Sequence, residues 1–281
     1  MKKSIITLLA LTLSLGLTAC GSSSTAEEST SEDGKTVVKV GVVGEYNAQW
    51  DTINELLADD GIEVELVKFT DYAAPNRALN DGEIDLNAFQ HKAFLANDIK
   101  QNGYEIESIG DTIIAPLSIY NNKDKISSVE EIKDGDIIAI PSDLTNGGRA
   151  LKLLEAAGLI ECDPAKGYVP TKADITKYNV QIEILEAESA TLANLLPDCT
   201  AALINGGNAF TAGLNPNEDA IFTEDINPET NAATPDLINV IAARSEDKDN
   251  EVYQKIVEAY RSEEVRQTIE ESYQGAFICA W

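Results

Sequence analysis

Apolar residues fall into short blocks separated by polar turns, from about residue 36 to the C-terminus. One block, Val37–Val43, is a β-branched run ending at Gly44, which is typical of a buried strand. We predict strands at Val37–Val43, Val64–Phe69, Asp85–Phe89, Tyr104–Ile114 (extended), Asp136–Ile140, Val180–Leu185, Ala201–Ile204, Ala220–Phe222 and Leu237–Ala243. We predict helices at Gln49–Ala58, Asn76–Asp81, Lys92–Asn102, Ser127–Ile132, Gly147–Ala157, Ser189–Leu196, Asn250–Tyr260 and Glu263–Tyr273. This alternation favours an α/β protein with mostly parallel sheet.

The N-terminus carries a separate apolar pattern. Lys2 and Lys3 precede Ile5–Leu17, which is too short to cross a membrane comfortably, and no other stretch approaches ~20 apolar residues. Leu17-Thr18-Ala19-Cys20 then resembles a bacterial lipobox, in which residues 1–19 are removed and the Cys20 thiol is acylated. An ordinary signal peptide with a chance cysteine is the alternative, but the small flanking residues and the polar tail favour a lipoprotein. We therefore expect an exported protein anchored by lipid to the extracytoplasmic face of the cell membrane.

The segment after Cys20 is a Ser-, Thr- and Glu-rich run that cannot contribute to a core, so residues 20–35 are expected to be a flexible tether. The remainder is long enough for one large or two medium domains. The formal net charge is −27, and becomes −29 when Lys2 and Lys3 are lost with the signal peptide. Such a charge argues against nucleic acid and against lying flat on an anionic bilayer.

Metal and cofactor sites have little support in the sequence, because the chain has one histidine and no CxxC, HExxH or EF-hand spacing. Cys162, Cys199 and Cys279 allow at most one intrachain disulfide. Export permits a bond, and Cys162–Cys199 is the first pair to test, but three unpaired thiols are an equal alternative. Catalysis is not expected, since no nucleophile elbow is present and His91 is the only histidine available for a triad.

Two segments carry polar residues suited to binding a small molecule. Phe89-Gln90-His91 ends a short strand, which is where open α/β sheets place ligands, although a histidine capping the next helix is the simpler interpretation. The segment 141–149 joins a strand to a helix, and its glycines would let backbone amides approach an anion. Arg149 in the first helical turn gains nothing from the helix dipole, so a bidentate hold on a carboxylate would explain it.

Other polar positions are weaker candidates. Asn205 begins Asn-Gly-Gly-Asn directly after an apolar strand, where a plain turn is a strong alternative. Asn239 lies inside an apolar run and must find a hydrogen-bond partner, either a ligand or the backbone. Tyr72 and Tyr120 add aromatic surface near strand ends.

Taken together, these segments resemble the NlpA/MetQ family of lipoproteins, the methionine-binding components of ABC importers. The likeness runs from the lipobox to the C-terminus and depends on KVGVVGEYNAQWD, KFTDYAAPNRALNDGEIDLNAFQHKAFL, IAIPSDLTNGGRALKLLEAAGLI, AALING with AGLNP, and INVIAAR. It implies a two-lobed periplasmic-binding-protein fold, type II-like, with the ligand cleft between the lobes. Lobe 1 would comprise residues 36–117 and 232–281, and lobe 2 residues 118–231.

The resemblance also implies roles for single residues. Tyr72, Phe89 and His91 would line a side-chain pocket with Tyr120 close by, while Asn146, Arg149, Asn205 and Asn239 would hold the amino-acid head group. The expected function is capture of a free amino acid, most simply L-methionine, by hinge closure and delivery to a permease with its ATPase, by a monomer without cofactor. A methionine-containing dipeptide, D-methionine or another apolar amino acid are alternatives, and an adhesin is the alternative of another class.

Overall fold

The computed structural model describes residues 29–30 and 34–281, so the predicted signal peptide, Cys20 and most of the predicted tether lie outside the described residues. The first of two main sheets has six strands within this part of the chain, in the order β1-β2-β4-β14-β5, with β3 on the other edge of β2. Its strands are β1 (Ser29–Thr30), β2 (Thr36–Val43), β3 (Ile62–Phe69), β4 (Leu86–His91), β5 (Ile106–Asp111) and β14 (Asn239–Arg244).

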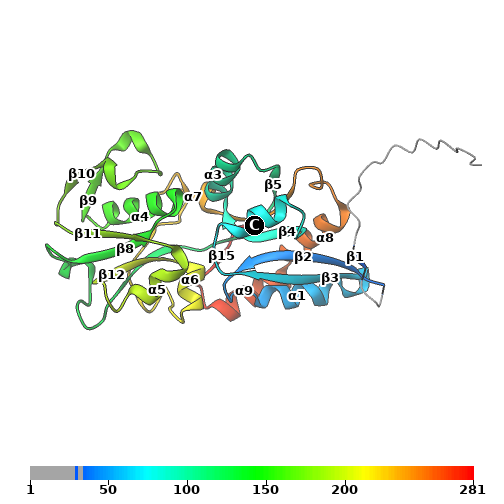
Figure 1. The fold of residues 1–281 in the computed structure, drawn as a ribbon. Coiled ribbons are helices and arrows are strands. Elements are labelled where there is room, and N and C mark those ends of the chain that lie inside the picture. The colour runs from blue at the N-terminus through cyan, green and yellow to red at the C-terminus, as the bar shows by residue number, and fades with distance from the viewer. Residues whose placement is uncertain (1–28, 31–33) are drawn as a thin grey trace, which may run out of the picture.

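The second main sheet has five strands in the order β11-β8-β12-β7-β13. They are β7 (Leu117–Asn121), β8 (Ile137–Pro141), β11 (Glu183–Ala187), β12 (Ala201–Asn205) and β13 (Ala220–Thr223). In Figure 1 these strands lie to the left, and those of the first sheet lie to the right. Two small antiparallel pairs accompany them: β9 (Ile160–Cys162) with β10 (Ile175–Tyr178), and β6 (Ile113–Ile114) with β15 (Ile278–Cys279).

Helices cover both faces of each main sheet. The α-helices are α1 (Ala48–Leu57), α2 (Ala74–Asn80), α3 (Lys92–Asn102), α4 (Leu144–Ala156), α5 (Leu192–Leu195), α6 (Gly206–Thr211), α7 (Thr234–Leu237), α8 (Glu251–Tyr260) and α9 (Glu263–Tyr273). Short 3₁₀ helices occupy Ala58–Asp60, Val129–Glu131, Pro164–Lys166, Lys172–Asp174 and Ser189–Thr191. The apolar clusters place α1, α8 and α9 on one face of the first sheet and α2 and α3 on the other. In the second sheet α4 covers one face, and α5 and α6 cover the other.

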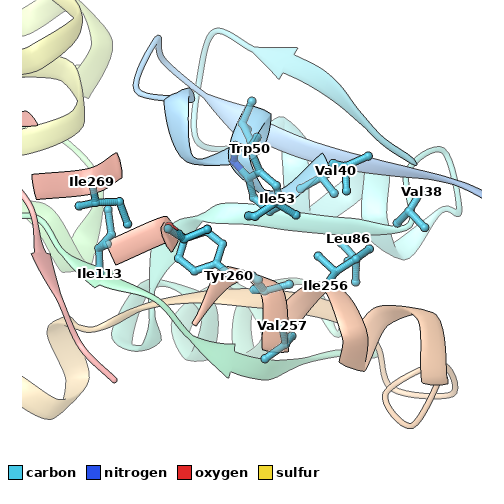
Figure 2. Packing of buried hydrophobic residues seen from close by; sticks show 14 of the residues in the cluster. Val38, Val40, Trp50, Ile53, Leu86, Ile113, Ile256, Val257, Tyr260 and Ile269 are labelled. Atoms are coloured by element: carbon cyan, nitrogen blue, oxygen red, sulfur yellow. The ribbon is translucent and has the colours of Figure 1, made fainter. Parts of the chain in front are cut away.

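The larger core of the first sheet buries the β-branched run of β2. Val38 and Val40 of β2 belong to one apolar cluster with Trp50 and Ile53 of α1 and Ile256 of α8 (Figure 2). Each of these side chains is at most 2% exposed. Burying a side chain of this size stabilises the fold by about 1.5–3 kcal/mol. The β-branched run identified in the sequence is therefore a core strand.

Several sequence predictions were wrong in detail. The sheets are mixed, not mostly parallel, because β14 runs antiparallel to β4 and β5, and β7 runs antiparallel to β12 and β13. The helix predicted at Ser127–Ile132 is a single 3₁₀ turn, closed by the Glu131 carboxylate on the Ser127 N–H. Ser29–Thr30, placed in the tether, pairs with β2. The segment Ser189–Leu196 divides into a 3₁₀ turn and α5.

The three cysteines in the described part of the chain are all free thiols. Cys162 packs in the cluster under α4, whereas Cys199 packs in the cluster on the opposite face of the same sheet. The sheet between them keeps the two sulfur atoms apart, so the pair proposed first from the sequence does not form. Burial raises the pKa of the thiol in both residues, which favours the neutral form.

Candidate functional site

A cavity lies between the two main sheets, with about 390 Å³ of empty volume including its mouth. Seven of the eight residues that the sequence singled out line it: Tyr72, Phe89, His91, Asn146, Arg149, Asn205 and Asn239. The remaining lining residues are Tyr46, Gln90, Phe94, Ala115 and Gly207.

Tyr120, the eighth residue, lies away from the cavity. It is the fourth residue of β7, and alternate residues of a strand face opposite sides of the sheet. Its neighbour Ile119 faces the α4 side, while Tyr120 is 1% exposed and packs with Leu192 and Ala209 under α5 and α6. The expectation that it lies near the ligand therefore conflicts with its place in the core of the second sheet.

One wall of the cavity is aromatic. Tyr72 follows β3, Phe89 is in β4, and Phe94 is in the first turn of α3. The three ring centroids lie 5.9–6.0 Å apart, in tilted and edge-to-face arrangements that are favourable for aromatic pairs. The Tyr72 hydroxyl accepts a hydrogen bond from Nδ2 of Asn208 at 3.0 Å, which links it to α6 on the second sheet. This wall is suited to an apolar or sulfur-containing side chain.

His91 is both the last residue of β4 and the N-cap of α3. Its Nδ1 accepts the backbone N–H of Phe94 at 3.1 Å, so the ring proton is on Nε2, which donates to Oδ1 of Asn146 at 3.2 Å. Burial, helped by the positive charge of Arg149, lowers the pKa of His91 from 6.5 to about 4. The imidazole is therefore neutral at physiological pH, and the capping role considered from the sequence is confirmed.

Asn146 connects the two sides of the cavity. Its Oδ1 accepts hydrogen bonds from His91 and from Nδ2 of Asn205, at 2.7 Å for the latter. Its Nδ2 donates to the carboxylate of Asp143, the N-cap of α4. Asn205 Oδ1 is buried and has no hydrogen-bond partner among the described residues. A buried acceptor of this kind is costly unless it meets a donor, so it is a natural contact for a ligand N–H.

Arg149 lies in the second turn of α4, because the helix begins at Leu144 and not at Gly147 as predicted. Its Nε donates to the Glu224 carboxylate oxygens at 2.8 and 2.9 Å, and its Nη2 donates to the same carboxylate and to the Ala115 carbonyl at 2.9 Å. The predicted bidentate hold on a carboxylate is thus made within the protein. The Arg149 side chain also lines the cavity.

The glycines of the 141–149 segment have a packing role that the sequence did not reveal. A Cβ atom on Gly147 would come within 2.9 Å of the Pro141 carbonyl oxygen, and one on Gly148 would come within 2.8 Å of Val169 Cα. The absence of side chains lets α4 approach neighbouring backbone. The expectation that these glycines bring amides to an anion has no support in this packing.

Five lining residues and one partner, Glu224, were not among the site residues singled out from the sequence. Gln90 belongs to a buried amide network in which Asn76 accepts from both Gln90 and Asn87. Tyr46, which follows β2 of the first sheet, contacts α6 on the second sheet, and a Cβ on Gly207 would lie only 2.6 Å from its ring. Glu224 was missed because its role depends on pairing with a residue 75 positions away. Of these residues, only Gln90 could have been noticed in the sequence, because it is a polar residue at the end of an apolar strand.

Metal-binding and membrane-spanning features are both missing from the described residues. They contain no cluster of three or more His, Cys, Asp or Glu side chains arranged to hold a metal ion. Across the same part of the chain, none of the helices combines the length and apolar character needed to cross a bilayer.

The sheets, the helices around them and the cavity between them define a substrate-binding-protein fold. The model of the NlpA lipoprotein family matches residues 38–281, and the chain belongs to this family. A relative from Salmonella typhimurium named D-methionine-binding lipoprotein MetQ is 38% identical over 276 residues, 97% of this chain and 96% of that protein.

Solved structures agree with this assignment. The substrate-binding protein of a methionine transporter from Streptococcus pneumoniae is 35% identical with a TM-score of 0.82, over 88% of this chain and 96% of that one. A nutrient-binding protein from Burkholderia cenocepacia, solved bound to methionine, is 34% identical with a TM-score of 0.80, over 87% of this chain and 100% of that one.

Proposed function

We propose that this protein captures free methionine in the cavity between its sheets and delivers it to an ABC importer. The observation that carries the proposal is the pairing of opposite chemistries in one cavity: a guanidinium on α4 faces a wall of aromatic rings. The Arg149 guanidinium suits the α-carboxylate, and the Asn205 Oδ1, which has no hydrogen-bond partner among the described residues, suits the ammonium. The rings of Tyr72, Phe89 and Phe94 suit the thioether. The names of the relatives support the same ligand.

We further propose two lobes, residues 36–117 with 232–281 and residues 118–231, that close on the ligand about the chain crossings between them. The membership of the two sheets supports this division. Asn239 of the first lobe and Asn146, Arg149 and Asn205 of the second would hold the head group together. Cys20 would carry the lipid anchor, and a monomer would dock on the permease with its ATPase; capture, not catalysis, is the role of the site.

Isothermal titration of protein that has been unfolded, freed of ligand and refolded tests the proposal. Both enantiomers of methionine are titrated, because the main prediction is L-methionine and the names of several relatives specify the D form. A glycine–methionine dipeptide and leucine are titrated in the same way, to test for a dipeptide or a different apolar amino acid as the ligand. If neither enantiomer gives heat at near-millimolar concentration, methionine is excluded as the ligand.

Arg149→Ala is expected to weaken methionine binding by about 2–5 kcal/mol, because the ligand carboxylate would lose its charged partner in a buried site. Arg261→Ala is the matched control, since Arg261 is an exposed arginine that bonds the Asp111 carbonyl away from the cavity. Titration calorimetry of both variants gives the comparison. A loss of less than twofold for Arg149→Ala would remove Arg149 from the site.

A further inference from the structure

We propose that Glu224 determines the charge of the ligand that the cavity accepts, favouring a zwitterion over a monoanion of the same shape. The inference depends on the proposed binding of an amino acid, and it assigns to one residue the discrimination against the corresponding α-hydroxy or α-keto acid. Glu224 was not found from the sequence, and it lines no part of the cavity.

Glu224 is held rigidly behind Arg149. The Arg149 and Glu224 side chains are only 5% and 7% exposed, and both oxygens of the carboxylate accept from the guanidinium. The Leu117 N–H donates to Glu224 Oε2 at 3.2 Å, and the Glu224 N–H donates to the Leu117 carbonyl at 3.0 Å. The position of the carboxylate is therefore fixed by the edge of the second sheet.

The guanidinium separates Glu224 from the ligand. Arg149 lines both the cavity and a surface groove on its other side, and Glu224 lines only that groove, beside Lys152 and Asp225. Lys152 is paired with Glu155 and is partly exposed, so solvent screens its charge. A ligand in the cavity would meet the Arg149 side chain with its positive charge already compensated by a buried carboxylate.

The charges around the cavity can be counted. Among the described residues that line it, Arg149 is the only one charged at neutral pH, because His91 is neutral. Two carboxylates stand directly behind the lining: Glu224 behind Arg149, and Asp143 behind Asn146. One positive and two negative groups leave no surplus positive charge for a monoanion. A zwitterion adds no net charge, and its ammonium is favoured by both carboxylates.

Without the charge of Glu224, the balance would change in a predictable direction. Arg149 would become a buried cation lacking its internal partner, and the carboxylate of any ligand would be attracted more strongly. The gain should be larger for a monoanion than for a zwitterion, because the ammonium of the zwitterion loses an attractive charge at the same time. The ratio of the two affinities is therefore the quantity that reports on Glu224.

The probes are L-methionine and its α-hydroxy analogue, which is a monoanion at neutral pH with the same side chain. The wild-type protein should bind methionine at least ~100-fold more tightly than the hydroxy acid. Glu224→Gln, which keeps size and hydrogen-bonding capacity, should narrow this ratio at least ~10-fold. Calorimetry or competition with labelled methionine measures both constants.

Two variants control for damage to the fold. Glu224→Asp keeps the charge and should keep the wild-type ratio even if both ligands bind more weakly. Asp225→Asn removes an exposed carboxylate from the same groove without touching Arg149, and should change neither constant. A purely structural role for Glu224 would weaken both ligands alike in Glu224→Gln and leave the ratio unchanged, which would overturn the proposal.

The affinities of the wild-type protein alone distinguish failure of the Glu224 proposal from failure of the proposed function. Equal affinity for methionine and the hydroxy acid would overturn the role of Glu224 while leaving the proposed function intact. Failure to bind methionine at all would overturn the proposed function instead.

Discussion

At the scale of single residues, His91 has the most constrained chemistry of the site. Its two ring nitrogens are committed to different partners, the Phe94 amide and the Asn146 carbonyl oxygen. Protonation of Nδ1 would turn the acceptor of the α3 cap into a donor facing another donor, and would place a cation near Arg149. The neutral ring is therefore required both by the helix and by the cavity.

A pH dependence follows from the lowered pKa of His91. The unfolded chain binds a proton near pH 6.5 and the folded chain only near pH 4, so stability falls as pH drops through this window. Between pH 7 and pH 5, the titration of His91 should lower the free energy of unfolding by about 2 kcal/mol. His91→Asn, which keeps a capping acceptor but does not titrate, should lose less stability over the same range. Denaturant unfolding of both proteins at the two pH values measures the difference, and equal losses would contradict the lowered pKa.

The sequence could identify polar residues of the site only where they stand out from their surroundings. His91, Asn205 and Asn239 follow or interrupt apolar strands, so their positions alone marked them. Glu224 and Tyr46 could not be found in this way, because an acidic residue or a loop tyrosine is ordinary in this chain. Their roles come from pairing across the fold. Tyr120 lies on the α5 and α6 face of the second sheet, and the sequence does not say to which face of a buried strand each residue points.

At the scale of elements, the start of α4 is the difference from the sequence analysis that most affects the site. We expected α4 to begin at Gly147, but Asp143 caps it by accepting the Asn146 N–H, so the helix begins three residues earlier. This shift takes Arg149 out of the first turn and turns its side chain toward Glu224. The short α6 and α7 were not predicted, since Gly206-Gly207 is typical of a turn and the segment at α7 contains only one helical turn.

The helix α6 contacts the first sheet's side of the cavity through a close approach at Gly207. A Cβ there would lie 2.6 Å from Tyr46 Cε1 and 3.0 Å from Cζ. We expect Gly207→Ala to weaken methionine binding at least ~10-fold, because the two sides could no longer meet as they do. Tyr46→Ala in the same protein removes the ring, and the double variant should bind no worse than Tyr46→Ala alone. Additive losses would show that the two residues act separately.

At the scale of the whole molecule, the two sheets are connected where the ligand would bind. The chain passes from β6 to β7 through Ala115 and Pro116, and returns between β13 and β14. Arg149 contacts both connections, through the Ala115 carbonyl and through Glu224, which directly follows β13. The strands β7 and β14, at which these two passages end, run antiparallel to their neighbours, which is also why the sheets are mixed. Local sequence patterns carry no information on this pairing, although they did identify an α/β protein.

The C-terminal strand β15 holds one of these connections in place. It pairs with β6 just before Ala115, the Ala280 N–H donates to the Thr112 carbonyl at 2.9 Å, and the Trp281 ring packs on Tyr260 and under Arg266. Deleting residues 278–281 should lower the free energy of unfolding by about 2–4 kcal/mol, since it removes several backbone hydrogen bonds and an aromatic contact.

The same deletion should also weaken methionine binding, because a frayed β6 would displace the Ala115 carbonyl that orients Arg149. Ile278→Ser is the matched control: this side chain is 49% exposed, so the change leaves the backbone pairing with β6 intact and should affect neither quantity. Denaturant melts and calorimetry on the two variants separate the effects. Lost stability with unchanged affinity would mean that β15 stabilises only the core of the first sheet and has no part in orienting the guanidinium.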